Sequence, residues 1–150
     1  MILACRDIKK GRDLCDELIK DNPSAKVEPK LCDLSSFASI RQLVIELDSE
    51  PQIDILVNNG AVMLIPLTKT VDGLEANFQI NYLGHYMLTL LLLEKLKASP
   101  QARVVNLVSS SYSRQFSTII SFFNHLLIEK KLELRKKFPI NRSEEGLGSD

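Results

Sequence analysis

The sequence has no net charge, no paired-cysteine motif and no membrane-length apolar run, and each absence excludes a class of protein. Nineteen basic and nineteen acidic residues cancel, so no basic field is available to recruit nucleic acid. The longest apolar stretch, near MLTLLLL, is too short to span a bilayer, and no basic segment followed by an apolar one opens the chain. Cys5, Cys15 and Cys32 form no CxxC pair and lie far from either histidine. This pattern predicts reduced, mostly buried thiols in a cytosolic type of compartment and no metal site.

What the sequence does contain is an alternation of apolar runs and helical patterns. The apolar runs are MILAC, KVEPKLCDL, IDILVNN and ARVVNLVSS, and Pro29 in the second indicates an edge strand or a bend. Helical spacing follows in IKKGRDLCDELIKD, in SSFASIRQLVIELDSE behind a Ser35 or Ser36 N-cap, and from about Asp72 to Lys97. Strands and helices that take turns predict βαβ units, so the expected fold class is α/β with a doubly wound parallel sheet.

Polar or glycine-containing tips follow all four predicted strands. The tips are Cys5-Arg6-Asp7, Cys32-Asp33-Leu34, Asn58-Asn59-Gly60-Ala61 and Ser109-Ser110-Ser111. In an open parallel sheet, ligands bind at the carboxyl ends of the strands, so this edge is the candidate site.

Five blocks of sequence resemble the short-chain dehydrogenase/reductase family, and more closely its retinol-dehydrogenase-like branch. They are LACRD, CDLSSFASIR, DILVNNGAVM, DGLEANFQINYLGHYMLTLLLLEKLKAS and ARVVNLVSS, and they run in the family's order from Met1 to about Ser113. The resemblance implies a Rossmann-like fold in which residues 1–115 form part of an NAD(P)-binding domain. It also implies an oxidoreductase that moves a hydride between NADP and a hydrophobic, retinoid- or steroid-like alcohol or carbonyl, with a possible homodimer contact through the helix 72–97.

The residues that would bind the adenosine end of the cofactor are Arg6, Asp33 and Leu34. An acidic residue after this strand would bind the ribose 2′-hydroxyl of NAD, whereas a guanidinium favours the 2′-phosphate of NADP. Arg6 therefore makes NADP the expected cofactor and NAD the less favoured one; its alternative role is a solvated loop arginine. By its family position Asp33 would accept a hydrogen bond from the adenine amino group, and it could also cap the helix that follows.

The third strand tip departs from the family in the order of its last two residues. The family tip reads Asn-Asn-Ala-Gly, in which the small residues let the backbone approach the cofactor and the asparagines brace the sheet. Here the order is Asn58-Asn59-Gly60-Ala61. Because glycine adopts positive φ freely and alanine does not, Ala61 is expected to be strained, or the turn rebuilt, if the last position needs that freedom.

The predicted catalytic residues are Asn81 and one of two serines. The resemblance implies that Asn81 kinks its helix and holds a water of the proton relay; the alternative is a buried amide tied to the backbone. Gly84 indicates a local irregularity or a close contact. Alignment on VSSS assigns the substrate oxygen to Ser110, and alignment on ARVVNL assigns it to Ser109, although serines after a strand are also ordinary turn residues. Tyr82 and His85 are interpreted as packing residues.

Two family motifs do not occur in these 150 residues: the glycine-rich TGxxxGIG turn and the catalytic YxxxK pair. The fourth residue after Tyr112 is Phe116. This chain alone is therefore expected to be inactive. The alternative to the oxidoreductase is a catalytically inactive, truncated fragment that acts as a binding or dimerising module. A partial gene model or an alternatively spliced product would explain the pattern. The tail 116–150 is expected to form an amphipathic helix followed by a disordered end. The expected location of the protein is either cytoplasmic or peripheral at an internal membrane.

Overall fold

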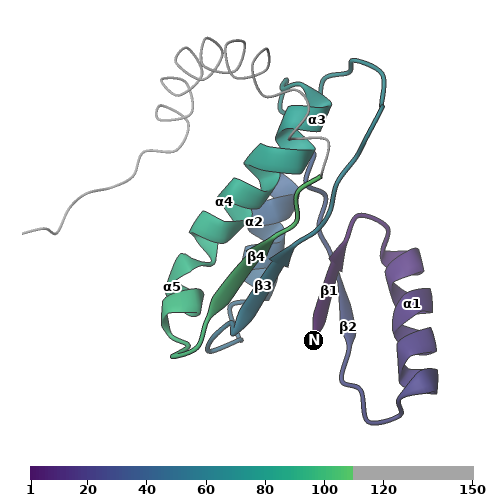
Figure 1. Cartoon of the computed structure of the whole chain (residues 1–150), viewed down its shortest axis with the longest axis vertical. Helices are drawn as coiled ribbons and strands as arrows, with labels where there is room; N and C mark the ends of the chain where they lie inside the picture. The colour runs from purple at the N-terminus through teal and green to yellow at the C-terminus, as the bar shows by residue number, and fades with distance from the viewer. Residues whose placement is uncertain (110–150) are drawn as a thin grey trace, which may run out of the picture. The chain divides into compact units, whose positions relative to one another are not determined.

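The structure, a computed structural model, describes residues 1–109 (Figure 1). The contacts divide the chain after Leu107, and the unit Met1–Leu107 carries every element and contact discussed below. Ser110, Tyr112 and the predicted tail 116–150 lie outside the described residues.

Strands and helices alternate along the described chain, as the sequence predicts. The elements are β1 (Ile2–Cys5), α1 (Ile8–Asp21), β2 (Glu28–Leu31), α2 (Phe37–Glu46), β3 (Ile55–Asn58), α3 (Ala76–Phe78), the π-helical turn η1 (Gln79–Leu83), α4 (Gly84–Leu91), α5 (Leu93–Lys97) and β4 (Arg103–Asn106). Within residues 1–109 the strands form two parallel pairs, β1 with β2 and β3 with β4. The fold is thus an incomplete Rossmann-like α/β fold, with β1 and β3 as the inner strands (Figure 1).

Helix α2 begins at Phe37 because Ser36 caps it. The Ser36 hydroxyl accepts a hydrogen bond from the Ser39 amide at 3.2 Å, which satisfies one of the free amides of the first turn. Of the two serines left open by the sequence, Ser36 is therefore the N-cap. Asp33 does not cap the helix: its carboxylate instead accepts from the Ser35 amide and hydroxyl at 2.8 and 2.7 Å.

The long helix predicted from Asp72 to Lys97 starts later and is interrupted. Asp72 lies in a turn, because Gly73 has a φ of 77° and its amide donates to the Thr70 carbonyl at 2.9 Å. The helix starts at Ala76, where the Glu75 carboxylate accepts from the amides of the first turn. It then passes through η1 and breaks at Leu92, where φ is −93° and ψ is 3°.

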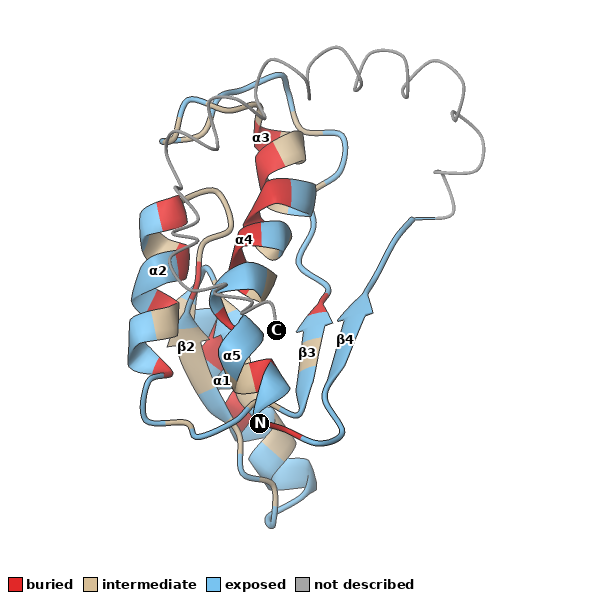
Figure 2. Cartoon of the chain, turned by 90° about the vertical axis from the view of Figure 1, so that its left-hand side faces the viewer, coloured by how far each residue is buried: buried red, intermediate tan, exposed pale blue. Residues whose placement is uncertain are grey.

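The core lies between α2 and the helical segment that runs from α3 to α5 (Figure 2). Its buried side chains include Ile40, Leu43, Leu47, Leu83, Leu88, Leu92 and Leu96. On the other side of the leucine-rich helix, Leu90 and Leu91 are exposed. Leu88, Leu92 and Leu96 thus belong to the core, while the homodimer contact predicted for residues 72–97 stays a prediction. Within residues 1–109, helices of membrane-spanning length and hydrophobicity are absent.

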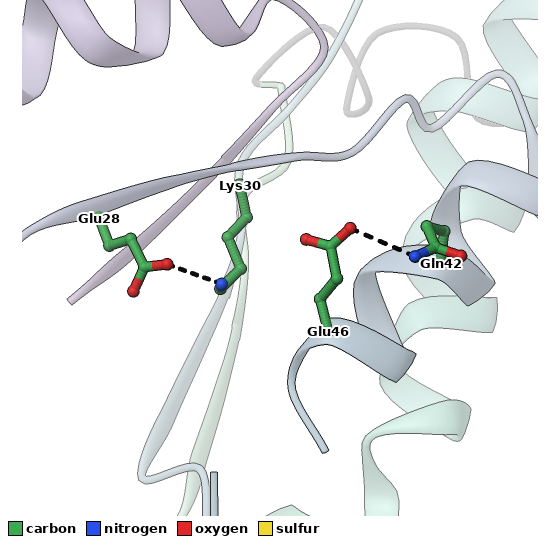
Figure 3. Close-up of polar contacts among 4 residues, drawn as sticks. All are labelled: Glu28, Lys30, Gln42 and Glu46. Atoms are coloured by element: carbon green, nitrogen blue, oxygen red, sulfur yellow. Dashed lines mark hydrogen bonds and ion pairs between the residues drawn. The ribbon is translucent and has the colours of Figure 1, made fainter. Parts of the chain in front are cut away.

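The outer edge of β2 carries features that discourage pairing with another strand. The amides of Glu28 and Cys32 donate to carbonyls of the β1 side, so alternation turns the backbone nitrogen of Pro29 toward the outer edge, where no N–H is needed. Lys30 forms an ion pair with Glu28 at 2.7 Å (Figure 3). Both proline and lysine are common at protected sheet edges, which agrees with the edge position predicted for Pro29.

Candidate functional site

A cavity of about 350 Å³ lies at the carboxyl ends of β1, β2 and β3. Six of the predicted cofactor-binding residues line it, together with side chains from η1 and α4. The six are Arg6, Asp33, Leu34, Asn58, Gly60 and Ala61. Asn59 is exposed and does not line the cavity. The strand tips that the sequence places far apart are therefore brought to one site.

The charged part of the cavity wall consists of Arg6 and Asp33. Arg6 follows β1, is exposed, and forms no ion pair with any other described residue. Asp33 is held in place by Ser35 at its carboxylate and by Ser39, whose hydroxyl accepts from the Asp33 amide at 2.9 Å. A guanidinium and a fixed carboxylate on one wall suit a ligand that carries both an anionic group and a hydrogen-bond donor.

The turn after β3 is held by a hydrogen bond from His85. The Nε2 atom of His85 lies 2.6 Å from the Gly60 carbonyl oxygen, so Nε2 carries the proton and donates. Neither Gly60 nor Ala61 has a positive φ, and among the described residues only Leu64, at 57°, is a non-glycine residue with one. The expected strain at Ala61 is therefore absent. Glycine fits at position 60 because an added Cβ would lie 3.1 Å from Leu34 Cδ1.

His85 is the site residue that the sequence analysis missed. It was interpreted as a packing residue, yet its ring lines the cavity and positions the turn. Its Nδ1 atom is buried and has no hydrogen-bond partner within the described part of the chain. The sequence signal that could have indicated this role is the spacing of His85, which lies about one helical turn after Asn81 and so on the same side of the helical segment.

Asn58 connects β3 to its two neighbours. Its Nδ2 atom donates to Thr89 Oγ1 on α4 at 3.1 Å and to Asn106 Oδ1 on β4 at 2.8 Å. The residue is 4% exposed, and its Oδ1 atom is buried without a hydrogen-bond partner among residues 1–109. A buried acceptor of this kind carries a desolvation penalty of about 1–3 kcal/mol until a donor reaches it.

Asn81 lies in the π-helical turn η1, so the helix is irregular at the place where the sequence predicts it. Its Oδ1 accepts from the Val62 amide and its Nδ2 donates to the Val62 carbonyl, both at 2.8 Å. The side chain is therefore tied to the backbone of the loop after β3. The alternative of a buried amide tied to the backbone is thus confirmed for the contact with the backbone and wrong for the burial, because Asn81 is exposed.

Gly84 fills the close-contact role expected of it. An added Cβ would lie 2.9 Å from the Leu34 carbonyl oxygen and 3.1 Å from the Leu34 Cβ. This contact presses the loop after β2 against α4. Of the candidate serines, Ser109 is exposed and lies beyond the boundary at Leu107, and Ser110 lies outside the described residues.

Two free thiols, those of Cys5 and Cys32, complete one wall of the cavity. Burial, with the negative charge of Asp33 and the neighbouring Cys5, raises the pKa of Cys32 to about 11. Burial and the charge of Asp7 also raise the pKa of Cys5. Both thiols are therefore protonated at neutral pH and are poor nucleophiles.

Comparison with known proteins places the chain in a family. The family model for short chain dehydrogenase matches residues 1–121. The chain belongs to the short-chain dehydrogenase family. Retinol dehydrogenase 12 of Mus musculus is 45% identical over 111 residues, which cover 73% of this chain and 35% of that protein. The chain resembles the retinol-dehydrogenase-like branch and spans about a third of the length of such relatives.

Two solved structures show the same fold. The NADPH complex of a short-chain dehydrogenase from Sphingobium yanoikuyae superposes with a TM-score of 0.60 at 24% identity, over 73% of this chain and 43% of that chain. The NADP active-site complex of RhlG from Pseudomonas aeruginosa has a TM-score of 0.55 at 27% identity, over 69% of this chain and 42% of that chain.

Proposed function

We propose that these 150 residues form the cofactor-binding part of an NADP-dependent oxidoreductase that acts on a hydrophobic alcohol or the corresponding carbonyl. The observation that carries the proposal is the presence of Arg6 and Asp33 on the wall of one cavity, at the ends of paired parallel strands, facing the same space as the Asn58–Ala61 turn. NADP would supply or accept the hydride. The described residues would hold its adenosine end.

The role of Arg6 is to bind the ribose 2′-phosphate. A guanidinium that is exposed and has no ion pair within residues 1–109 can form a bidentate, charge-assisted pair with a phosphate. Asp33 would accept from the adenine amino group through the carboxylate oxygen that Ser35 leaves available. The complex of RhlG with NADP supports this choice of cofactor.

The role of the β3 side is to keep backbone groups close to the cofactor. His85 and Asn81 hold the loop from Gly60 to Val62 by three hydrogen bonds. Gly60 leaves room beside Leu34. Ser109 or Ser110 would hold the substrate oxygen, and Asn81 would take part in the proton relay; both assignments remain predictions.

The proposed substrate class is retinoid- or steroid-like. Its support is the similarity to retinol dehydrogenase 12 and to polyprenol dehydrogenase of Homo sapiens, whose names denote large apolar alcohols. The homodimer contact through residues 72–97, and a domain that extends to residue 115, belong to the same proposal.

The test measures binding of the adenosine end alone. The 150-residue chain is titrated with 2′,5′-ADP and with 5′-AMP, which differ by the 2′-phosphate. Arg6→Asp is expected to weaken 2′,5′-ADP binding by roughly 10–100-fold relative to 5′-AMP, because a charge-assisted contact becomes repulsive. Arg12→Asp, an equal charge change on the exposed face of α1, is the matched control and should leave the ratio within about twofold. An unchanged ratio in Arg6→Asp would show that Arg6 is a surface arginine only.

Turnover is a separate matter from this binding test. Because YxxxK does not occur in these 150 residues, we expect no NADPH oxidation when the chain is mixed with a hydrophobic aldehyde such as all-trans-retinal. General acid catalysis by such a tyrosine typically contributes about 10²–10⁴-fold. Steady oxidation of NADPH by the purified chain would contradict this expectation.

A further inference from the structure

The turn after β3 contains an asparagine that is followed by a glycine. Asn59 and Gly60 come directly after β3 (Figure 1), and no other asparagine of the 150 residues precedes a glycine. In such a pair the backbone nitrogen of the glycine can attack the side-chain carbonyl carbon of the asparagine, because a glycine has no Cβ to hinder the approach. The order of residues in this turn therefore creates a reactive pair that an alanine at position 60 would not.

Both reacting groups of the pair are free in the structure. Asn59 is exposed to solvent. Its side chain and the Gly60 amide form no hydrogen bond within the described part of the chain. Neither the nucleophile nor the carbonyl carbon that it would attack is therefore held away from the other by a competing partner.

The peptide unit between Asn59 and Gly60 lies between two units that are held. The Asn58 carbonyl accepts from the Leu107 amide at 3.1 Å, and the Gly60 carbonyl accepts from His85 Nε2 at 2.6 Å. The unit between them, the Asn59 carbonyl with the Gly60 N–H, has no such bond within residues 1–109. It can rotate through opposite changes of ψ at Asn59 and φ at Gly60, since a glycine adopts either sign of φ freely. The fold thus leaves the geometry of attack accessible.

A second pair in the chain, Asp72–Gly73, shows what protection from the same cyclisation looks like. The Asp72 carboxylate accepts from the Phe37 amide at 2.8 Å and from Gln79 Nε2 at 2.6 Å. The Gly73 amide donates to the Thr70 carbonyl at 2.9 Å. Cyclisation there would break all three hydrogen bonds, which opposes the reaction. The fold, and not the dipeptide alone, separates the free pair from the protected one.

We infer that Asn59 is a site of spontaneous deamidation. The Gly60 nitrogen gives up its proton and bonds to Cγ of Asn59, the bond from Cγ to Nδ2 breaks, and ammonia leaves with that proton, so a succinimide ring forms. Water then opens the ring. Opening at Cγ gives aspartate, whereas opening at the backbone carbonyl carbon gives isoaspartate, in which the chain runs through the former side chain. Water is the only co-reactant, and nothing is oxidised or reduced.

Either product changes the cavity wall. Position 59 lies between Asn58 and Gly60, which line the cavity, and a new carboxylate there repels a ligand that carries phosphates. Isoaspartate also lengthens the backbone by one carbon, which displaces the Gly60 carbonyl from His85 Nε2. This consequence rests on the proposed function: an NADP site at this cavity would lose affinity as the protein ages.

The test compares the folded chain with a short peptide of the same sequence. The 150-residue chain and the blocked peptide Val-Asn-Asn-Gly-Ala-Val, residues 57–62, are kept at neutral pH and body temperature, and mass spectrometry with chromatographic separation counts aspartate and isoaspartate. The rate at Asn59 in the folded chain is expected to lie within about tenfold of the peptide rate, because the turn offers little protection. No isoaspartate is expected at Asp72. Gly60→Ala should slow the reaction at least about tenfold through its added Cβ.

A rate at Asn59 more than about 100-fold below that of the peptide would show that the fold protects the pair and would overturn the inference. Isoaspartate at Asp72 as fast as at Asn59, or an unchanged rate in Gly60→Ala, would overturn it as well.

Ligand binding provides a second readout. The affinity of the unmodified chain for 2′,5′-ADP is expected to fall at least about threefold as the products accumulate. Asn59→Asp should bind weakly from the start. Asn59→Gln keeps an amide that can cyclise only through a larger, slower-forming ring, so its affinity should stay constant with time. Constant affinity in a largely deamidated chain would overturn the effect on the cavity. If the fresh chain does not bind 2′,5′-ADP, the proposed function fails, while the mass measurement still decides whether Asn59 deamidates.

Discussion

The two ends of the cavity are built from different chemistry. On the β1–β2 side, the wall carries Arg6, Asp33 and two protonated thiols, and the Arg6 guanidinium forms no ion pair with a described residue. On the β3–α4 side, His85 and Asn81 are bonded to the backbone of the loop after β3. The first side therefore offers charge to a ligand, whereas the second offers a fixed backbone.

The difference assigns the two sides separate tasks. Charge-assisted contacts discriminate between ligands that differ by a phosphate, so specificity should depend on the β1–β2 side. A turn held by hydrogen bonds brings the backbone to a reproducible position, so the β3–α4 side should affect stability and geometry. Leu34 connects the sides, because it packs against the positions of Gly60 and Gly84.

The largest expected effect comes from breaking that connection. Gly84→Ala would place a Cβ 2.9 Å from the Leu34 carbonyl oxygen, a backbone atom that cannot move alone. We expect the free energy of unfolding to fall by about 2–3 kcal/mol, as for an overpacked core position, measured by urea denaturation.

Gly60→Ala is the matched control for this change. Its Cβ would lie 3.1 Å from Leu34 Cδ1, the end of a flexible side chain, so the loss should stay below about 1 kcal/mol. Equal losses in the two variants would mean that the loop after β2 yields as easily as a side chain and does not connect the two sides.

A smaller effect is expected at Asn81, on the β3–α4 side alone. Asn81→Ala removes both bonds to Val62, and because the residue is exposed we expect a loss of about 1.5 kcal/mol. Asn81→Asp keeps an acceptor for the Val62 amide but sets a carboxylate oxygen against the Val62 carbonyl oxygen, which repels it. Exchange at the Val62 amide should therefore quicken in the alanine variant and quicken less in the aspartate variant, which retains an acceptor for that amide. The ratio of 2′,5′-ADP to 5′-AMP affinity should stay constant in both variants. A shift in that ratio would contradict the assignment of ligand specificity to the β1–β2 side.

The sequence predicts the strand ends well because the signal there is local. Apolar runs followed by polar tips mark Arg6, Asp33 and Asn58, and a parallel topology brings them to one edge. The predicted start of the long helix was wrong because Asp72 lies in a turn, where its carboxylate accepts hydrogen bonds from the Phe37 amide and the Gln79 side chain. The capping role of Asp33 was wrong because Ser35 competes for its carboxylate. The packing interpretation of His85 left out its hydrogen bond to the Gly60 carbonyl, because that partner lies 25 residues away in the sequence.

The smallest effect tests whether the thiols of the β1–β2 side are neutral, so that Arg6 and Asp33 supply its charge. The pKa of Cys32 is raised from 9.0 to about 11 by burial and by Asp33. A raised folded-state pKa contributes stability that is fully present below pH 9 and is lost as the pH rises toward 11, because the unfolded chain ionises first. The full shift corresponds to about 1.4 kcal/mol per pH unit, and solvent near the thiol reduces this, so we expect the unmodified chain to lose about 1 kcal/mol more than Cys32→Ala between pH 8 and 11. Urea denaturation at each pH measures the difference. Parallel curves for the two proteins would mean that Cys32 ionises as easily in the folded as in the unfolded chain, and that burial and Asp33 do not raise its pKa.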